Sequence, residues 1–111
     1  MLREGQGVYG RITFVDGVFP EYDRTYLVVS VSDENVGVLN ISSAIGKAAS
    51  LLLPTNRYIN NHYPPFLKKS FVKLDSYVRI TIDEALSLRV LANGETLDDR
   101  ELDAIKKAII Y

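Results

Sequence analysis

The strongest constraint on the fold is the segment from Tyr26 to Val31, which is rich in valine and apolar except for Ser30. A strand with one wet face alternates apolar and polar residues, whereas a continuous apolar run predicts a strand that is covered on both faces. Such a strand needs neighbouring strands and further layers above and below it. With 111 residues, 47% of them hydrophobic, the chain fills one core and fits one domain, residues 1–111.

Three further segments predict strands beside this run. Val8 to Val15 alternates with a period of two, and Val36 to Ile41 is a third apolar segment. Phe71 to Ile82 also alternates, which predicts a long strand broken by a bulge near Ser76. The chain is therefore predicted to be mostly β.

The segment from Ser42 to Lys69 is harder to assign. Ala44 to Leu53 fits either a short helix or a loop that leads into a strand around Leu52 to Ile59. Asn60 to Pro65 is predicted to be a loop by its asparagines and prolines.

A C-terminal helix is predicted after a short strand from Leu86 to Leu91. Thr96 is the expected N-cap of this helix. Apolar residues then recur at spacings of three and four, at Leu102, Ile105 and Ile109. One face of the helix is apolar, so we expect it to dock on the sheet. Strands with polar turns and one closing helix indicate a compact, barrel-like sheet.

Composition excludes several kinds of site. The chain has no cysteine, which excludes disulfides, a thiol nucleophile and a sulfur-based zinc site, and its single histidine argues against a histidine metal cluster. The net charge of −1 gives no overall attraction for a nucleic acid, so an RNA substrate requires a local cluster of cations. No apolar stretch approaches the roughly 20 residues of a membrane helix, and no secretory signal is apparent. We expect a soluble, cytoplasmic protein with no membrane contact.

Several stretches, taken in order, resemble the MazF/PemK toxins of toxin–antitoxin modules: Gly7 to Asp16, Arg24 to Ser30, Val36 to Ser43, Leu53 to Thr55 with Lys69 to Asp75 and Thr81 to Asp83, and Leu97 to Ile110. The resemblance implies a small SH3-like β-barrel of the MazF/PemK/CcdB type with a C-terminal α-helix. It also implies a homodimeric endoribonuclease that cuts single-stranded RNA without a metal or cofactor, by attack of the 2′-OH that leaves a 2′,3′-cyclic phosphate. The implied partner is an antitoxin with an acidic, extended tail.

Two departures from the family pattern concern the site. The segment from Pro20 to Thr25 lacks the glutamine and the proline that the family has in its first loop. Between Asp75 and Thr81 this chain has about two more residues than the family pattern, so Arg79 has no secure counterpart there.

The resemblance implies four catalytic residues. Arg24 would stabilise charge on the phosphoryl group, since a guanidinium stays charged and forms paired hydrogen bonds to phosphate. Ser42 would donate a hydrogen bond to the phosphate. Lys73 and Asp75 match a basic residue and an aspartate two positions apart, which lie on one face of a strand. Expected substrate-binding residues, as stacking rings, hydroxyls or cations, are Tyr22, Ser43, Arg57, Tyr77 and Arg79.

Each of these residues also has a structural explanation. Arg24 can cap a strand and pair with a nearby carboxylate, Ser42 can simply form a turn, and Lys73 with Asp75 can be an exposed ion pair worth less than ~1 kcal/mol. Two other functions therefore stay open: a binding module with the same fold and no nuclease activity, and a gyrase inhibitor of the CcdB type. The chain's C-terminus lacks the Trp-Gly-Ile of that last group.

Overall fold

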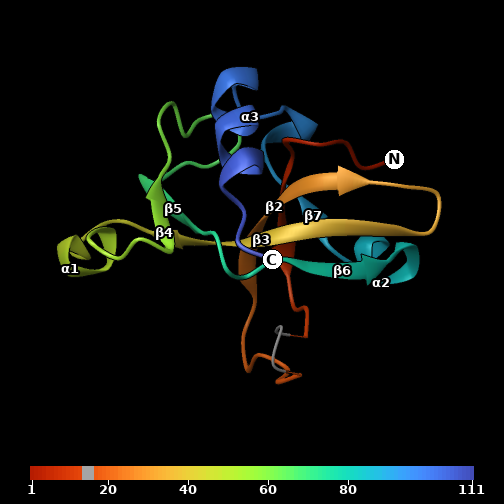
Figure 1. Ribbon diagram of the computed structural model, residues 1–111. Coiled ribbons are helices and arrows are strands. Elements are labelled where there is room, and N and C mark those ends of the chain that lie inside the picture. Colours follow the sequence, from red (N-terminus) through yellow and green to blue (C-terminus); the bar gives the residue numbers. More distant parts are fainter. Residues whose placement is uncertain (14–16) are drawn as a thin grey trace.

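The computed structural model describes residues 1–13 and 17–111, which form one antiparallel sheet with three α-helices around it (Figure 1). The strands are β1 (Gly7–Gly10), β2 (Arg24–Val31), β3 (Asn35–Ser43), β4 (Asn56–Tyr58), β5 (Ser70–Lys73), β6 (Val78–Thr81) and β7 (Arg89–Val90). Their order is β4-β5-β3-β2-β1-β7, and β6 also pairs with β3. The predicted mostly-β fold with a C-terminal helix is confirmed, as an open sheet within the described residues.

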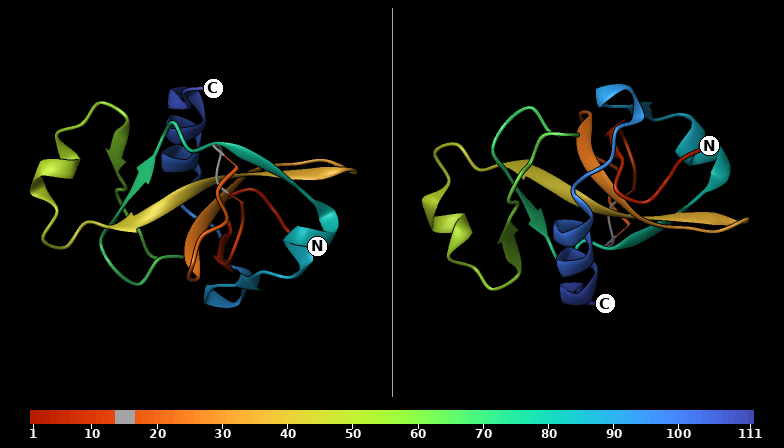
Figure 2. Two further views of the ribbon diagram at one scale, coloured as in Figure 1. Left: turned by 90° about the horizontal axis from the view of Figure 1, so that it is seen from below. Right: turned by 90° about the horizontal axis from the view of Figure 1, so that it is seen from above.

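The helices lie at separate places along the sheet. They are α1 (Ala48–Leu51), α2 (Ile82–Leu86) and α3 (Asp99–Ala108), and a 3₁₀ turn covers Ala92–Gly94. Figures 1 and 2 show α1 at one end of the molecule, α2 at the other, and α3 between them against the sheet. Of the two alternatives for residues 44–53, the short helix is present as α1, and the strand expected around residues 52–59 is present as the shorter β4.

The central position of β2 is confirmed, since residues 26–29 are buried on both faces of the sheet. On one face, Leu27, Leu39 and Val72 pack in a cluster with Leu97 and Ile105, which belong to the α3 region. We call this the α3 face. On the opposite face, a second cluster is formed by Val8, Ile12, Tyr26, Val28, Val36, Val38, Ile80, Ala85 and Leu88. The apolar run of β2 thus supplies both cores.

The prediction of one strand from Phe71 to Ile82 is wrong. The segment forms β5, then a turn of residues 74–77 that we call the arch, and then β6. Both strands pair with β3. Ile41 pairs with Val72 and Val38 pairs with Val78, so three residues of β3 lie opposite six residues of the other segment. The Ser76 hydroxyl fills the break: it donates to the Lys73 carbonyl at 2.6 Å and accepts from the Asn40 amide at 2.8 Å. The strand is broken near Ser76 as predicted, but the break is a turn of several residues that holds the three extra residues, and not a bulge within one strand.

Other predicted boundaries also change. Ile82 begins α2 because Thr81 and Glu84 form a reciprocal capping box, with the Glu84 amide donating to Thr81 Oγ1 at 3.1 Å. The strand predicted from Leu86 to Leu91 is only two residues long. Strand β1 ends at Gly10, and residues 14–16 of the predicted first strand lie outside the described residues.

The predicted N-cap of the last helix is wrong. Asp98 is the N-cap, and its carboxylate accepts from the Glu101 amide at 3.1 Å. Thr96 instead forms an isolated bridge with Gln6. The aspartate lies where the helix dipole favours negative charge, which explains why it starts the helix two residues later than expected. The helix ends at Ala108, so Ile109 packs on the core from outside it.

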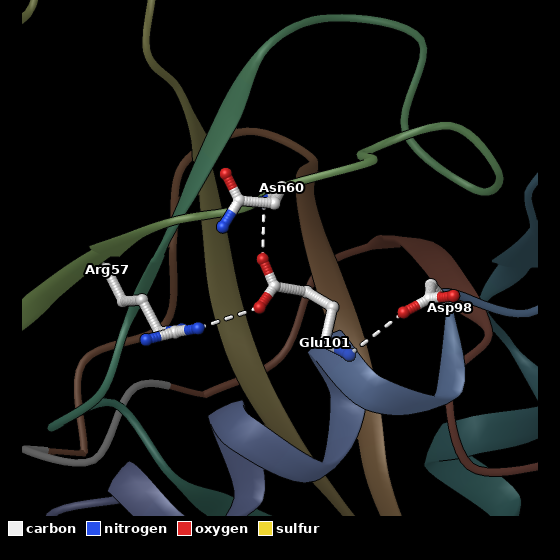
Figure 3. Close-up of polar contacts among 4 residues, drawn as sticks. All are labelled: Arg57, Asn60, Asp98 and Glu101. Atoms are coloured by element: carbon white, nitrogen blue, oxygen red, sulfur yellow. Dashed lines mark hydrogen bonds and ion pairs between the residues drawn. The ribbon is translucent and has the colours of Figure 1, made fainter.

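Glu101 fastens α3 to the sheet, as Figure 3 shows. Its buried carboxylate accepts from Arg57 of β4 at 2.8 Å and from the backbone amide of Asn60. A buried carboxylate requires such partners, because an unpaired charge in the interior is costly. The interaction holds the helix on one face of the sheet and leaves the other face beside β2, β3 and β5 free of it.

Candidate functional site

A group of side chains crosses three neighbouring strands on the face opposite α3. We call it the central grid, and it has two positions on each strand: Arg24 and Tyr26 on β2, Ser42 and Asn40 on β3, and Phe71 and Lys73 on β5. Alternate residues of a strand point to the same face, and Tyr26 belongs to the core cluster opposite α3, so the grid lies on that face.

The strand register sets two rows within the grid. Tyr26 lies directly opposite Asn40, and the neighbouring pairs continue this row to Lys73. Ser42 lies directly opposite Phe71, and the register continues this second row to Arg24. Side chains of adjacent strands in one row are close neighbours, so the sheet brings together residues that are distant in the sequence.

Lys73 shows the electrostatic character of the grid. Its pKa is lowered from the usual lysine value, first by burial and then by the positive charges of Arg24 and Lys47, while Asp75 acts in the opposite direction. Arg24 and Lys73 thus lie within electrostatic reach of one another. The prediction that Lys73 and Asp75 lie on one face of a strand is wrong, because β5 ends at Lys73. Asp75 is exposed in the arch after β5 and lies near enough to affect the same ammonium group.

Two buried polar side chains form the floor of the grid. Tyr26 and Asn40 are only 3% and 5% exposed, yet the Tyr26 hydroxyl and the Asn40 side-chain carbonyl oxygen have no hydrogen-bond partner of normal geometry. Burial raises the pKa of Tyr26 despite the nearby Ile12 amide and the charge of Arg24. Buried polar groups are nearly always hydrogen-bonded, so two unsatisfied atoms on residues paired across neighbouring strands call for an explanation.

Tyr22 is brought to the grid by Arg24. The guanidinium donates to the Tyr22 hydroxyl at 2.9 Å and lies 4.6 Å from the centre of its ring. The carboxylate of Asp23, one structural alternative for pairing with Arg24, is in an ion pair with Arg11 at 3.2 Å. Tyr22 is exposed, and this contact holds a flat aromatic surface next to a cation.

The remaining predicted substrate-binding residues lie elsewhere. Arg57 points to the α3 face and pairs with Glu101. Arg79 donates to the Tyr77 hydroxyl at 3.4 Å, on the part of the sheet beyond the arch. Ser43 follows Ser42 and therefore points to the α3 face. The structure thus brings together the four predicted catalytic residues and Tyr22, and separates them from these four.

Sequence reasoning missed Asn40 and Lys47 as members of this neighbourhood. Asn40 was the available signal, because it interrupts an otherwise apolar strand between Leu39 and Ile41. A buried asparagine in such a strand is uncommon and needs partners or a function. Lys47 gave no signal, since only folding brings the segment before α1 near Lys73.

Two features are absent from the described parts of the chain. Within residues 1–13 and 17–111, no three histidine, aspartate or glutamate side chains are grouped so that they could hold a metal ion. None of the helices in that same part has the length and hydrophobicity needed to cross a membrane.

No family model matches the sequence, and no curated protein matches it.

Proposed function

We propose that this chain is a MazF/PemK-type toxin, a metal-independent endoribonuclease for single-stranded RNA whose active site is the central grid. The observation that supports this most directly is the pair of cations, Arg24 and Lys73, on one sheet face above the unsatisfied floor of Tyr26 and Asn40. Like charges held near each other repel, so an anion between them gains attraction from both and relieves the repulsion. A phosphodiester is such an anion.

The proposed reaction needs no protein nucleophile. The RNA 2′-oxygen forms a bond to the adjacent phosphorus, the bond from phosphorus to the 5′-oxygen breaks, and the products are a 2′,3′-cyclic phosphate and a free 5′-OH. A base must remove the 2′-OH proton, an acid must protonate the leaving oxygen, and charge on the phosphoryl oxygens must be stabilised.

Three side chains suit these tasks. Arg24 remains charged and supplies the paired donors that stabilise phosphoryl oxygens. Lys73 has a lowered pKa and is therefore a better proton donor to the leaving oxygen than an ordinary lysine. Asp75 is exposed and within electrostatic reach of Lys73, and in this proposal its carboxylate accepts the 2′-OH proton.

Two further side chains suit binding. Ser42 is in the same row as Arg24, and its hydroxyl is proposed to donate to a non-bridging phosphate oxygen. Tyr22 offers an exposed ring on which an unpaired base can stack. In this proposal the adjacent Arg24 guanidinium binds the phosphate backbone of the RNA.

The remaining family features belong to the same proposal. They are closure of the fold as an SH3-like barrel, a homodimer, cytoplasmic action, and inhibition by an antitoxin with an acidic, extended tail. The charges support the last of these, because Arg24, Lys47 and Lys73 would attract such a tail as they would attract RNA.

Incubation of the purified protein with a long single-stranded RNA in EDTA tests the proposal. We expect discrete fragments with 2′,3′-cyclic phosphate ends. Arg24→Ala should lower the cleavage rate by about 10²- to 10³-fold, as the loss of one transition-state donor does in other enzymes. Lys73→Ala and Asp75→Asn should lower it by at least about 10²-fold, the usual contribution of a general acid or base.

Arg100→Gln and Asp33→Asn are the matched controls, since both change an exposed charge away from the grid and should leave the rate unchanged. Absence of cleavage with every RNA tested would contradict the nuclease proposal. If the protein nevertheless bound RNA, and Arg24→Ala abolished binding, the result would favour the non-catalytic binding module.

A further inference from the structure

The α3 face contains a cavity that shares only Ser42 with the proposed nuclease site. Its volume is about 570 Å³, within the range of small-ligand pockets. The residues of one sheet row, Arg89, Tyr9, Thr25 and Ile41, form one wall, because each lies directly opposite the next across β7, β1, β2 and β3. Ile41 belongs to the core cluster that packs on α3, which places this wall on the α3 face.

The walls of the cavity combine aromatic rings with positive charge. Tyr9, Tyr63 and Phe66 supply the rings, and the Arg89 guanidinium lies 5.1 Å from the centre of the Tyr9 ring. Lys68 supplies a second cation. No carboxylate lines the cavity among the described residues, so the local charge is positive although the whole chain is slightly acidic.

Hydroxyl groups provide polar contacts between these rings and cations. Thr25 and Ser43 line the cavity from adjacent strands, and Ser70 lies opposite Ser43 on β5. The Ser70 hydroxyl donates to the Lys68 carbonyl at 2.7 Å and so helps to hold the segment that carries the second cation. The rings, cations and hydroxyls match a flat heterocycle, an anionic group and a sugar, respectively.

A strained residue lies on the rim of the same cavity. Ala92 lines the cavity and has a φ of +50°, a left-handed conformation that costs an L-residue with a Cβ about 1–2 kcal/mol. Strained backbone of this kind gathers at ligand-binding segments, where the surrounding structure holds it in place. The rim is thus fixed in a shape that local preference does not favour.

We propose that this cavity binds a nucleoside 5′-monophosphate, with the base against the aromatic rings and the phosphate between Lys68 and Arg89. Two cations suit a phosphate dianion, and the serine and threonine hydroxyls suit a ribose. Most of the lining lies on the opposite face from the central grid, since Thr25 and Ser43 alternate with Arg24 and Ser42, and Ser42 is the one grid residue that also lines the cavity. Neither cation of this proposal, Lys68 or Arg89, belongs to the central grid, so nucleotide binding can be tested separately from RNA cleavage.

Titration with AMP, GMP, CMP and UMP, followed by calorimetry and by amide NMR shifts, tests the proposal. We expect saturable binding of at least one monophosphate, with shifts at Tyr9, Thr25 and Ser43. Tyr63→Ala should weaken binding about tenfold, the effect of losing one base–aromatic stack. Arg89→Gln should weaken binding of the monophosphate and leave the much weaker binding of the uncharged nucleoside unchanged. Both side chains are exposed, so both variants should fold.

Arg100→Gln serves as the control, because it removes an exposed positive charge from α3 and should not affect binding. Ribose 5-phosphate and inorganic phosphate should bind far more weakly than the nucleotide. Equal binding of these phosphates would overturn the proposal, because the aromatic walls would then contribute nothing. Shifts confined to the residues around Arg24 and Lys73 would also overturn it, while the nuclease proposal would remain. Absence of nucleotide binding would likewise overturn the nucleotide proposal and leave the nuclease proposal unaffected.

Discussion

The pKa of the Lys73 ammonium group reports the effect of each neighbouring charge in the candidate site. Burial and two neighbouring cations oppose its charge, and one neighbouring carboxylate favours it. A lowered pKa in the folded state means that the unfolded chain binds this proton more tightly. As the pH rises through the folded-state pKa toward the usual lysine value, the penalty for the buried charge disappears. Lys73 therefore contributes more favourably to stability at high pH than at neutral pH.

Substitution of each neighbour should move this pKa in a known direction. Arg24→Gln removes a repelling charge and should raise the pKa of Lys73, whereas Asp75→Asn removes an attracting charge and should lower it. NMR titration of the Lys73 side-chain resonances measures both effects. Arg100→Gln should leave the pKa unchanged. If Arg24→Gln also left it unchanged, the two cations would not interact and the anion site proposed between them would lose its basis.

At the level of elements, long apolar or periodic patterns in the sequence predicted the structure correctly. Short local signals that interrupt such a pattern, such as a capping box, were missed. The apolar run of β2 and the periodicity of the last helix were sufficient to predict a central strand and a docked helix. The alternation from Phe71 to Ile82 concealed both the arch and α2, although the Thr81-Ile82-Asp83-Glu84 capping box was present in the sequence. Alternation describes which residues are apolar, but not where a side-chain hydroxyl replaces a backbone partner.

The candidate site was also predicted only in part. Arg24, Ser42, Lys73 and Asp75 came from a resemblance in ordered motifs, and strand register brought them together. Arg57 was assigned by its charge alone, and its partner Glu101 is 44 residues away in the sequence. Charge clusters read along a chain do not reveal which face of a sheet each side chain occupies.

The start of α3 gives a direct test at this level. Asp98→Ala should destabilise the protein by about 1 kcal/mol, because the Glu101 amide loses its acceptor and the helix loses a negative charge at its N-terminus. Thr96→Ala should have a much smaller effect. Denaturant unfolding of both variants measures the difference. A larger loss of stability for Thr96→Ala would mean that the helix starts where the sequence alone suggested.

For the whole molecule, the near-neutral charge limits how RNA is attracted. A net charge of −1 provides no long-range steering, so binding must depend on a few local cations. The central grid supplies Arg24, Lys73 and the nearby Lys47. Proteins that bind nucleic acid through a large basic surface lose much more affinity with added salt than this arrangement allows.

The salt dependence of RNA affinity tests this limit. With about three phosphates neutralised, the logarithm of the association constant should fall with the logarithm of salt concentration with a slope of about −2. Fluorescence anisotropy with a short single-stranded RNA between about 50 and 200 mM salt measures it, using Arg24→Ala to suppress cleavage and correcting the expected slope by one cation. A slope twice as steep would show that a much wider surface contacts the RNA.

The arch between β5 and β6 has a consequence for how this site can diverge. Lys73 is the last residue of a paired strand, whereas Asp75 is in the inserted segment that the Ser76 hydroxyl ties down. Gain or loss of a residue in that segment would alter the reach of the carboxylate and leave the ammonium group in register. Related chains could thus retune the spacing between their acid and base by changing loop length alone, without redesigning the sheet.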